Sequence, residues 1–245
     1  MPRVRKRIPV VVRLVWTAAE LAVTLGAVLM LLVVHQLWWT NREALASARR
    51  QVAELEREWR GTPPAFEPLP SPSMRSEHRT VIEESPSGSP SPGPRPDLAY
   101  AVLRIPRLGV TAPVAEGVDK GGVLDKGYVG HYPRTAQPGR AGNVALAGHR
   151  NTHGEPFRRL DRLRPGDTVR IDTADARYTY LVERTLPQTT PGDGTVLARI
   201  PYSSVHPGHR YTEPGYYLTL TTCTPEYTST YRLVVWGRLA KAEPR

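Results

Sequence analysis

A long apolar stretch near the N-terminus constrains this chain more than any other feature. Between about Leu14 and Trp39 only Glu20 carries a formal charge, and Leu21–Val34 contains no ionisable residue. A helix of this length rises about 39 Å at roughly 1.5 Å per residue, which is enough to cross a hydrocarbon core of about 30 Å. The stretch therefore predicts a single transmembrane helix over residues 14–39.

The residues on either side of this stretch indicate its orientation. A basic segment, residues 1–13, precedes it, and Trp38 and Trp39 lie where an aromatic belt would mark the far interface. Basic residues are retained on the cytoplasmic side. We therefore expect a cytoplasmic N-terminus in the cell membrane and an extracellular remainder.

A cleaved signal peptide is the alternative, because it also combines a basic start with an apolar core. The apolar run is longer than the usual core of a signal peptide, and no small-x-small cleavage site follows it. Ala44-Leu45-Ala46 comes nearest, but it lies inside a helical pattern. The sequence favours an uncleaved anchor.

Two connecting segments follow the anchor. Residues 40–60 have helical periodicity, and Asn41 is a candidate N-cap. This pattern predicts a solvated stalk that continues the membrane helix. A short coiled-coil dimer contact is the alternative. Residues 61–97 hold ten of the 25 prolines and many serines. Such a composition buries too little apolar area to offset the entropy of ordering, so we expect a partly extended linker.

Residues 98–245 read as a single β-rich domain. Short β-patterned runs alternate with Gly, Pro and Asp turns, which favours an all-β closed barrel or a sandwich. We also expect a short helix at Pro156–Leu163 and a functional loop in the irregular stretch Leu186–Gly215. The predicted strands are Ala99–Ile105, Val110–Val114, Gly142–Ala147, Thr168–Asp172, Arg177–Thr185, Tyr216–Thr222 and Tyr231–Leu239.

Cys223, the only cysteine, excludes an intrachain disulfide and a cysteine-rich zinc site. It ends a strand of alternating apolar and threonine residues, and Pro225 prevents the ladder from continuing. A thiol outside the cell is exposed to oxidation. Cys223 is therefore a candidate nucleophile, against the alternative of an inert buried side chain.

His149 follows another apolar strand, Asn143–Ala147, after the single small residue Gly148. This position delivers an imidazole to the rim of the domain. His35 falls in the membrane span and His78 in the linker. The remaining histidines lie in loops without a comparable strand before them, although the sequence leaves His131 and His153 open.

Arg232 lies near the start of the last predicted strand. Eight residues, Thr224–Tyr231, separate it from Cys223, so a hairpin would place the two side by side. Its guanidinium keeps its proton and offers fixed donors to a developing oxyanion. A solvated arginine is the alternative, but alternation puts Arg232 on the face of Val234 and Trp236.

Together these residues resemble the sortases, membrane-anchored cysteine transpeptidases of Gram-positive bacteria. The family's Thr-Leu-x-Thr-Cys matches Thr219–Cys223, its strand-end histidine matches His149 in AGHR, and its last-strand arginine matches Arg232. Leu163–Val169 resembles the family's Leu-x-x-Gly-Asp-x-Ile/Val turn. The stretches GHYPRTAQPG and AGHRNTHGEPF are most similar to the class E sortases of actinobacteria.

The resemblance implies an eight-stranded barrel that cleaves a C-terminal sorting signal of Leu-Ala-x-Thr-Gly or Leu-Pro-x-Thr-Gly type. Cys223 would form a thioester, which the amine of a lipid-linked peptidoglycan precursor resolves. His149 would act as general acid and base, and Arg232 would hold the oxyanion. Thr222 would contact substrate or oxyanion, and Tyr132 would line the pocket for the signal's second residue. The partners would be secreted proteins that carry such a signal.

Neither a cofactor nor a metal is expected, because no acidic cluster resembles the calcium site of some class A members. An L,D-transpeptidase is disfavoured, since its Ser-x-Gly-Cys motif is missing. The net charge of +10 is typical of nucleic-acid binders, but an exported domain rarely meets nucleic acid. A non-catalytic, membrane-tethered wall-binding module would explain the anchor, linker and charge, but not the arrangement of His149, Cys223 and Arg232.

Overall fold

The structure, a computed structural model, describes residues 10–61 and 98–245. The basic residues before Val10 and residues 62–97 of the predicted linker lie outside this range. The chain divides into two compact units, one ending at Thr40 and the other running from Asn41 to Arg245. The predicted catalytic domain therefore shares its unit with the segment read from the sequence as a stalk.

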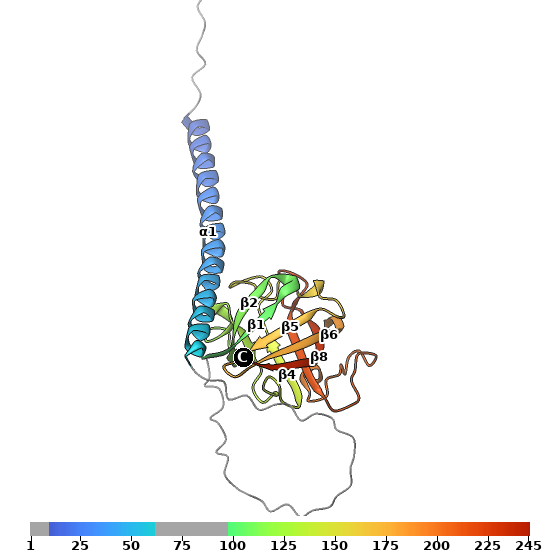
Figure 1. Cartoon of the computed structure of the whole chain (residues 1–245). Helices are drawn as coiled ribbons and strands as arrows, with labels where there is room; N and C mark the ends of the chain where they lie inside the picture. Colours follow the sequence, from blue (N-terminus) through green and yellow to red (C-terminus); the bar gives the residue numbers. More distant parts are fainter. Residues whose placement is uncertain (1–9, 62–97) are drawn as a thin grey trace, which may run out of the picture. The chain divides into compact units, whose positions relative to one another are not determined.

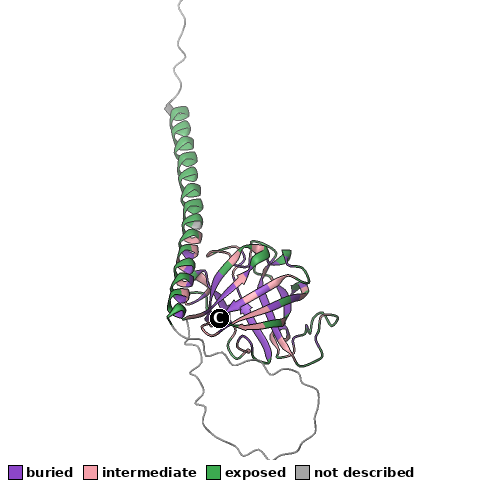
Figure 2. Ribbon diagram, viewed as in Figure 1, coloured by how far each residue is buried: buried purple, intermediate pink, exposed green. Residues whose placement is uncertain are grey.

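Helix α1 is continuous from Val10 to Arg60. Within the described part of the chain, it is the one helix long and apolar enough to cross a membrane, as judged by length and composition. The apolar residues from Val11 to Val34 are exposed, as the colouring of Figure 2 shows and as contact with lipid would require. These features suggest membrane anchoring. Because the helix continues through Asn41, that residue is not an N-cap.

The second unit contains a closed barrel of eight strands, as Figure 1 shows. The strands follow one another around the barrel in the order β1-β2-β3-β4-β7-β8-β6-β5. Two neighbouring pairs, β2 with β3 and β4 with β7, are parallel, and the others are antiparallel. The bounds are β1 Ala99–Ile105, β2 Val110–Glu116, β3 Val129–His131, β4 Gly142–Ala147, β5 Thr168–Asp172, β6 Ala176–Thr189, β7 Tyr216–Thr224 and β8 Tyr231–Pro244.

Alternation along β7 and β8 separates two apolar clusters. Leu218 and Leu220 point into the main core, which fills the barrel. Tyr217 and Trp236 belong to a second cluster on the outer face. Residues 190–215, which connect β6 to β7, contribute Val196 and Tyr211 to this outer cluster and so cover that face. The loop expected from the irregular sequence is thus packed onto the barrel.

Asp193 holds this loop in shape. Its Oδ2 accepts hydrogen bonds from Thr189 Oγ1 at 2.7 Å and Ser203 Oγ at 2.6 Å, and its Oδ1 accepts from Thr195 Oγ1 and Ser204 Oγ. Burial opposes ionisation, but these hydrogen bonds outweigh it and lower the pKa of Asp193 to about 2. An ionised carboxylate therefore connects the end of β6 to the loop.

The prediction of a short helix at Pro156–Leu163 is wrong. The segment forms successive turns and one 3-10 turn, Leu160–Arg162, with hydrogen bonds that span three residues. The apolar residues Phe157, Leu160 and Leu163, whose spacing suggested a helix, are instead spaced so that all three are buried in the barrel core. Strand β3 was not predicted, since three residues are too few to show periodicity.

The prediction of a solvated stalk is also wrong. The part of α1 in the second unit has a buried stripe with helical spacing. It packs against Val102, Ala115, Val123 and Tyr128 of the barrel and its loops. The buried helix residues are Ala44, Ala48, Val52, Leu55 and Trp59.

Polar contacts accompany this packing. Arg104 on β1 forms ion pairs with Glu56 of the helix and with Asp172 on β5, the latter at 3.1 Å. The guanidinium of Arg245 lies 4.3 Å from the centre of the Trp59 ring, within the range of a cation–π interaction. Both ends of the barrel sequence therefore contact residues 41–60.

A substitution in the stripe distinguishes a packed helix from a solvated stalk. In a chain of residues 41–245, Leu55→Ala is expected to lower the free energy of unfolding by about 2–3 kcal/mol, because it removes buried methyl groups and leaves a cavity. The exposed neighbour Glu58→Ala, the control, should change it by no more than about 0.5 kcal/mol. Chemical denaturation measures both, and equal small effects would show that this helix does not pack on the barrel.

Candidate active site

The candidate nucleophile and the candidate oxyanion donor lie on neighbouring strands. Cys223 on β7 pairs directly with Arg232 on β8 in antiparallel register. Cys223 is partly buried and carries a free thiol. Since paired residues project to the same face of a sheet, both side chains lie on the outer face with Val234 and Trp236. The predicted hairpin is confirmed.

The guanidinium of Arg232 is held by the loop that joins these strands. Its Nη1 donates to the carbonyl oxygen of Ser229 at 2.9 Å and to that of Tyr231 at 3.0 Å. On its other side Arg232 pairs with Thr189, whose hydroxyl donates to Asp193. The arginine thus lies between the nucleophile strand and the attachment point of the covering loop.

His149 reaches the same rim from β4. The parallel register of β4 and β7 pairs Ala147 with Thr221. Beyond that pair, Gly148 N donates to Thr221 O at 3.2 Å, and Thr222 Oγ1 donates to Gly148 O at 2.8 Å. The segment after β4 and the end of β7 therefore run side by side. This brings His149, the residue after Gly148, to the end of β7 where Cys223 lies.

Arg150 fixes this arrangement from the interior side. It is 7% exposed, and its Nη1 donates to Cys223 O at 3.2 Å and to Thr224 Oγ1 at 2.8 Å. In the sequence this residue stands out only as the last member of AGHR, and no pattern assigns it a role. Its place directly after the candidate histidine was the available signal.

A carboxylate contacts the imidazole of His149. Asp125 Oδ1 lies 2.8 Å from His149 Nε2, and His153 Nδ1 lies 3.5 Å from the same oxygen. Because a carboxylate only accepts hydrogen bonds, Nε2 is the donor in this contact, and in a neutral ring the lone pair would then lie on Nδ1. Asp125 could not be recognised from the sequence, because it lies in a loop with no strand pattern to indicate its role.

The three histidines of this region differ in their surroundings. His131 is fully buried and contacts Glu116, Tyr100 and Thr135 through its ring nitrogens, so it supports the structure. His153 follows His149 in a turn and has φ of +52°. Within the described ranges, Asp125, His149 and His153 form one group whose ligand atoms all lie within 4.8 Å of one another, close enough to hold a metal ion.

Thr222 and Tyr132, the two predicted substrate contacts, differ in placement. The hydroxyl of Thr222 is buried and bonds to Gly148 O, on the opposite face of β7 from Cys223. The hydroxyl of Tyr132 lies 3.1 Å from Thr221 Oγ1, and Thr221 shares the outer face with Cys223. Tyr132 is therefore on the side of the nucleophile, whereas the side chain of Thr222 connects β7 to the turn before His149.

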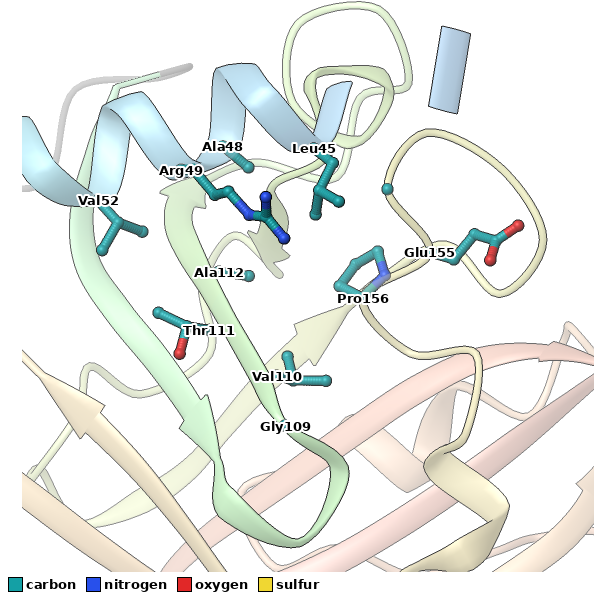
Figure 3. A pocket seen from close by; sticks show the side chains of 12 residues that line it. Leu45, Ala48, Arg49, Val52, Gly109, Val110, Thr111, Ala112, Glu155 and Pro156 are labelled. Atoms are coloured by element: carbon teal, nitrogen blue, oxygen red, sulfur yellow. The ribbon is translucent and has the colours of Figure 1, made fainter. Parts of the chain in front are cut away.

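A cavity of about 380 Å³ lies apart from Cys223, between residues 41–60 of α1, strand β2 and the turn after His153 (Figure 3). Leu45, Val52 and Ala112 supply apolar walls, and Pro156 closes it on the side of the turn. The cavity contains none of the three candidate catalytic residues. Its walls include Gly127 and Gly154, which belong to the loops that carry Asp125 and His153.

The chain is similar to known proteins. The sortase domain model matches residues 103–240. Sortase SrtE1 of Streptomyces coelicolor is 40% identical over 232 residues, which cover 92% of this chain and 57% of that protein. Sortase SrtE2 of the same organism is 33% identical over 230 residues, covering 91% of this chain and 81% of the relative.

A solved structure is similar as well. The crystal structure of sortase E1 from Streptomyces coelicolor, which holds a tripeptide in its active site, superposes with a TM-score of 0.58 at 46% identity, covering 62% of this chain and 94% of that one. This chain spans little more than half the length of full SrtE1. The domain match nevertheless covers more than half of this chain, and the chain belongs to the sortase family.

Proposed function

We propose that this protein is a membrane-anchored cysteine transpeptidase that joins secreted proteins to the cell wall. The pairing of Cys223 with Arg232, at the rim where His149 follows β4, carries the proposal. Family membership and similarity to two sortases E support it. The substrate would be a C-terminal sorting signal of Leu-Ala-x-Thr-Gly or Leu-Pro-x-Thr-Gly type.

The first step forms an acyl-enzyme. Cys223 gives its thiol proton to Nδ1 of His149, and the resulting thiolate attacks the carbonyl carbon of the threonine in the signal, whose oxygen becomes an oxyanion. The C–N bond to glycine then breaks, and the departing amine takes a proton from His149. The product is a thioester between Cys223 and the threonine.

The second step transfers the acyl group. The amine of a lipid-linked peptidoglycan precursor attacks the thioester carbonyl and loses a proton to His149, and the Cys223 thiolate leaves. The hydrogen bond from His149 Nε2 to Asp125 leaves Nδ1 as the nitrogen that gives and takes this proton. Asp125 thus acts as a positioning residue.

Arg232 supplies fixed donors at the oxyanion. Its Nη1 is used by the carbonyl oxygens of Ser229 and Tyr231, so we assign the oxyanion contact to Nε and Nη2. Tyr132 would line the pocket for the second residue of the signal, because it lies on the nucleophile's face of the sheet. Thr222 would act through its bond to Gly148, or through its backbone, rather than through its hydroxyl.

Replacing the nucleophile tests the central claim. Residues 41–245 should cleave a Leu-Ala-x-Thr-Gly peptide and exchange its glycine for an added glycine-like amine, and Cys223→Ala should abolish both reactions. Thr228→Ala, in the exposed loop between β7 and β8, is the control and should retain them. Mass spectrometry follows both products. Cleavage by a folded Cys223→Ala variant would remove the cysteine mechanism, and no cleavage by the wild type would favour a wall-binding module.

Variants of His149 and Arg232 should lose activity in different ways. His149→Ala should lose most turnover, and a small amine base in the buffer should restore part of it by carrying the missing proton. Arg232→Lys keeps the charge but loses the planar fork, so it should lose roughly 30- to 1,000-fold, which corresponds to about 2–4 kcal/mol, and the base should not restore it.

Arg238→Lys, on the same strand but beside Tyr217, is the matched control and should stay near wild type. Steady-state kinetics on the peptide measures all three variants. If Arg232→Lys were as active as wild type, Arg232 would be a structural residue.

The proposed topology is testable in cells. The full chain should fractionate with membranes at its unprocessed mass, because α1 would remain as an anchor. External protease should degrade the catalytic domain in protoplasts, while a cytoplasmic marker protein, the control, stays intact. A soluble chain lacking its N-terminus would instead establish a signal peptide, and a protected domain would reverse the orientation.

A further inference from the structure

Three side chains, those of Asp125, His149 and His153, form a cluster that the proposed transfer does not fully use. Asp125 belongs to the short turn Leu124–Lys126 between β2 and β3, and His149 and His153 belong to the segment after β4. The rings of the two histidines lie 5.4 Å apart, centre to centre, with 31° between their planes. Acyl transfer requires one imidazole, so His153 needs another explanation.

The three ligand atoms are close to the spacing of a metal site. Asp125 Oδ1 is 2.8 Å from His149 Nε2 and 3.5 Å from His153 Nδ1, and all three atoms lie within 4.8 Å of one another. Ligand atoms at about 2.1 Å from a tetrahedral Zn²⁺ ion lie about 3.4 Å apart. The side chains are 36%, 18% and 26% exposed, so rotations that move these atoms by on the order of 1 Å are open to them.

His153 is directed at this carboxylate without a hydrogen bond. Its Nδ1 is buried and has no hydrogen-bond partner, although the oxygen of Asp125 lies 3.5 Å away. A buried ring nitrogen without a partner is costly. A cation between the nitrogen and the oxygen would satisfy both atoms.

The backbone that carries these ligands is braced. Gly154 N donates to Asn41 Oδ1 at 2.6 Å, and a Cβ at Gly127 would lie 2.8 Å from the carbonyl oxygen of Ala44. Both glycines have φ of +81°, a conformation that other residues rarely adopt. The helix residues 41–48 therefore hold both ligand-bearing loops, and binding would not require the loops to be ordered first.

We propose that Asp125, His149 and His153 bind a Zn²⁺ ion, and that the bound ion reversibly inhibits the acyl transfer. Two imidazoles and one carboxylate are a donor set that Zn²⁺ prefers, and three protein ligands leave one coordination position open. This ion is an inhibitor rather than a cofactor. The binding stands by itself, and only the inhibition rests on the proposed function.

Inhibition follows from the protons of His149. In the metal-free ring the proton lies on Nε2, toward Asp125, and Nδ1 is free to accept another. A neutral imidazole bound to Zn²⁺ through Nε2 has its proton on Nδ1. That nitrogen then has no lone pair to accept the proton of the incoming amine.

Direct binding tests the site without reference to catalysis. Zn²⁺ is titrated into the full chain in detergent micelles, without an affinity tag and with Cys223→Ala to remove the thiol, in competition with a chromophoric chelator. One ion should bind per chain. His153→Asn, which tolerates a positive φ, should weaken binding by about tenfold or more. His209→Asn, in the loop between β6 and β7, is the matched control and should bind as the parent does.

A second measurement covers poorly folded variants and the inhibitory effect. Zn²⁺ should raise the melting temperature of the Cys223→Ala chain but not of the same chain with His153→Asn. If the chain with His153→Asn does not fold, Asp125→Asn takes the place of His153→Asn. In the chain with Cys223 intact, Zn²⁺ should inhibit peptide cleavage, and a chelator should restore the rate. The His153→Asn variant, compared with its own zinc-free rate, should need about tenfold more Zn²⁺ for the same inhibition.

Three results would overturn the proposal. The first is that Zn²⁺ does not bind at one ion per chain. The second is that His153→Asn binds Zn²⁺ as tightly as the parent chain, or that His209→Asn loses as much affinity as His153→Asn. The third is stoichiometric binding that leaves cleavage unchanged. An inactive wild-type chain that still binds Zn²⁺ with the expected variant pattern would contradict the proposed function and leave the binding site standing.

Discussion

The parallel pairing of β4 with β7 is the constraint on which the candidate site depends. Parallel strands run toward the same edge of a sheet, so the segment after Ala147 continues beside the end of β7, where Gly148 bonds to Thr221 and Thr222. The antiparallel return of β8 then adds Arg232 beside Cys223. A slip of one residue would turn every side chain of β7 to the other face and move Cys223 into the barrel. The hydrophobic core therefore sets the register that the chemistry requires.

The nucleophile and the histidine are held by different means. Cys223 lies in a strand with ladders on both sides, whereas His149 lies in a loop. Arg150 connects that loop to the carbonyl of Cys223, and Asn41 of α1 connects it to the helix. The residues that continue the apolar helix thus help to orient the imidazole of His149, and the folded unit begins at Asn41 rather than at Leu98.

Much of this could be predicted from the sequence, because period-2 alternation and strand-end motifs are local. Seven of the eight strands and the pairing of Cys223 with Arg232 follow from such patterns. The packing of Leu55 and Trp59 could not be predicted, since an amphipathic helix gives no sign of which surface covers its apolar side. Asp125 was missed for a similar reason, as only the tertiary fold brings its loop to His149.

The contact between Asp125 and His149 also has an electrostatic consequence. A carboxylate that accepts a hydrogen bond from the imidazole places a negative charge beside Nε2 of His149. With a second imidazole 3.5 Å from the same oxygen, that charge attracts either a proton or a metal ion. An aliphatic residue at His153 would keep the hydrogen bond to His149 and remove the third donor. The proposed proton transfer and the proposed metal binding thus share one carboxylate but differ in their need for His153.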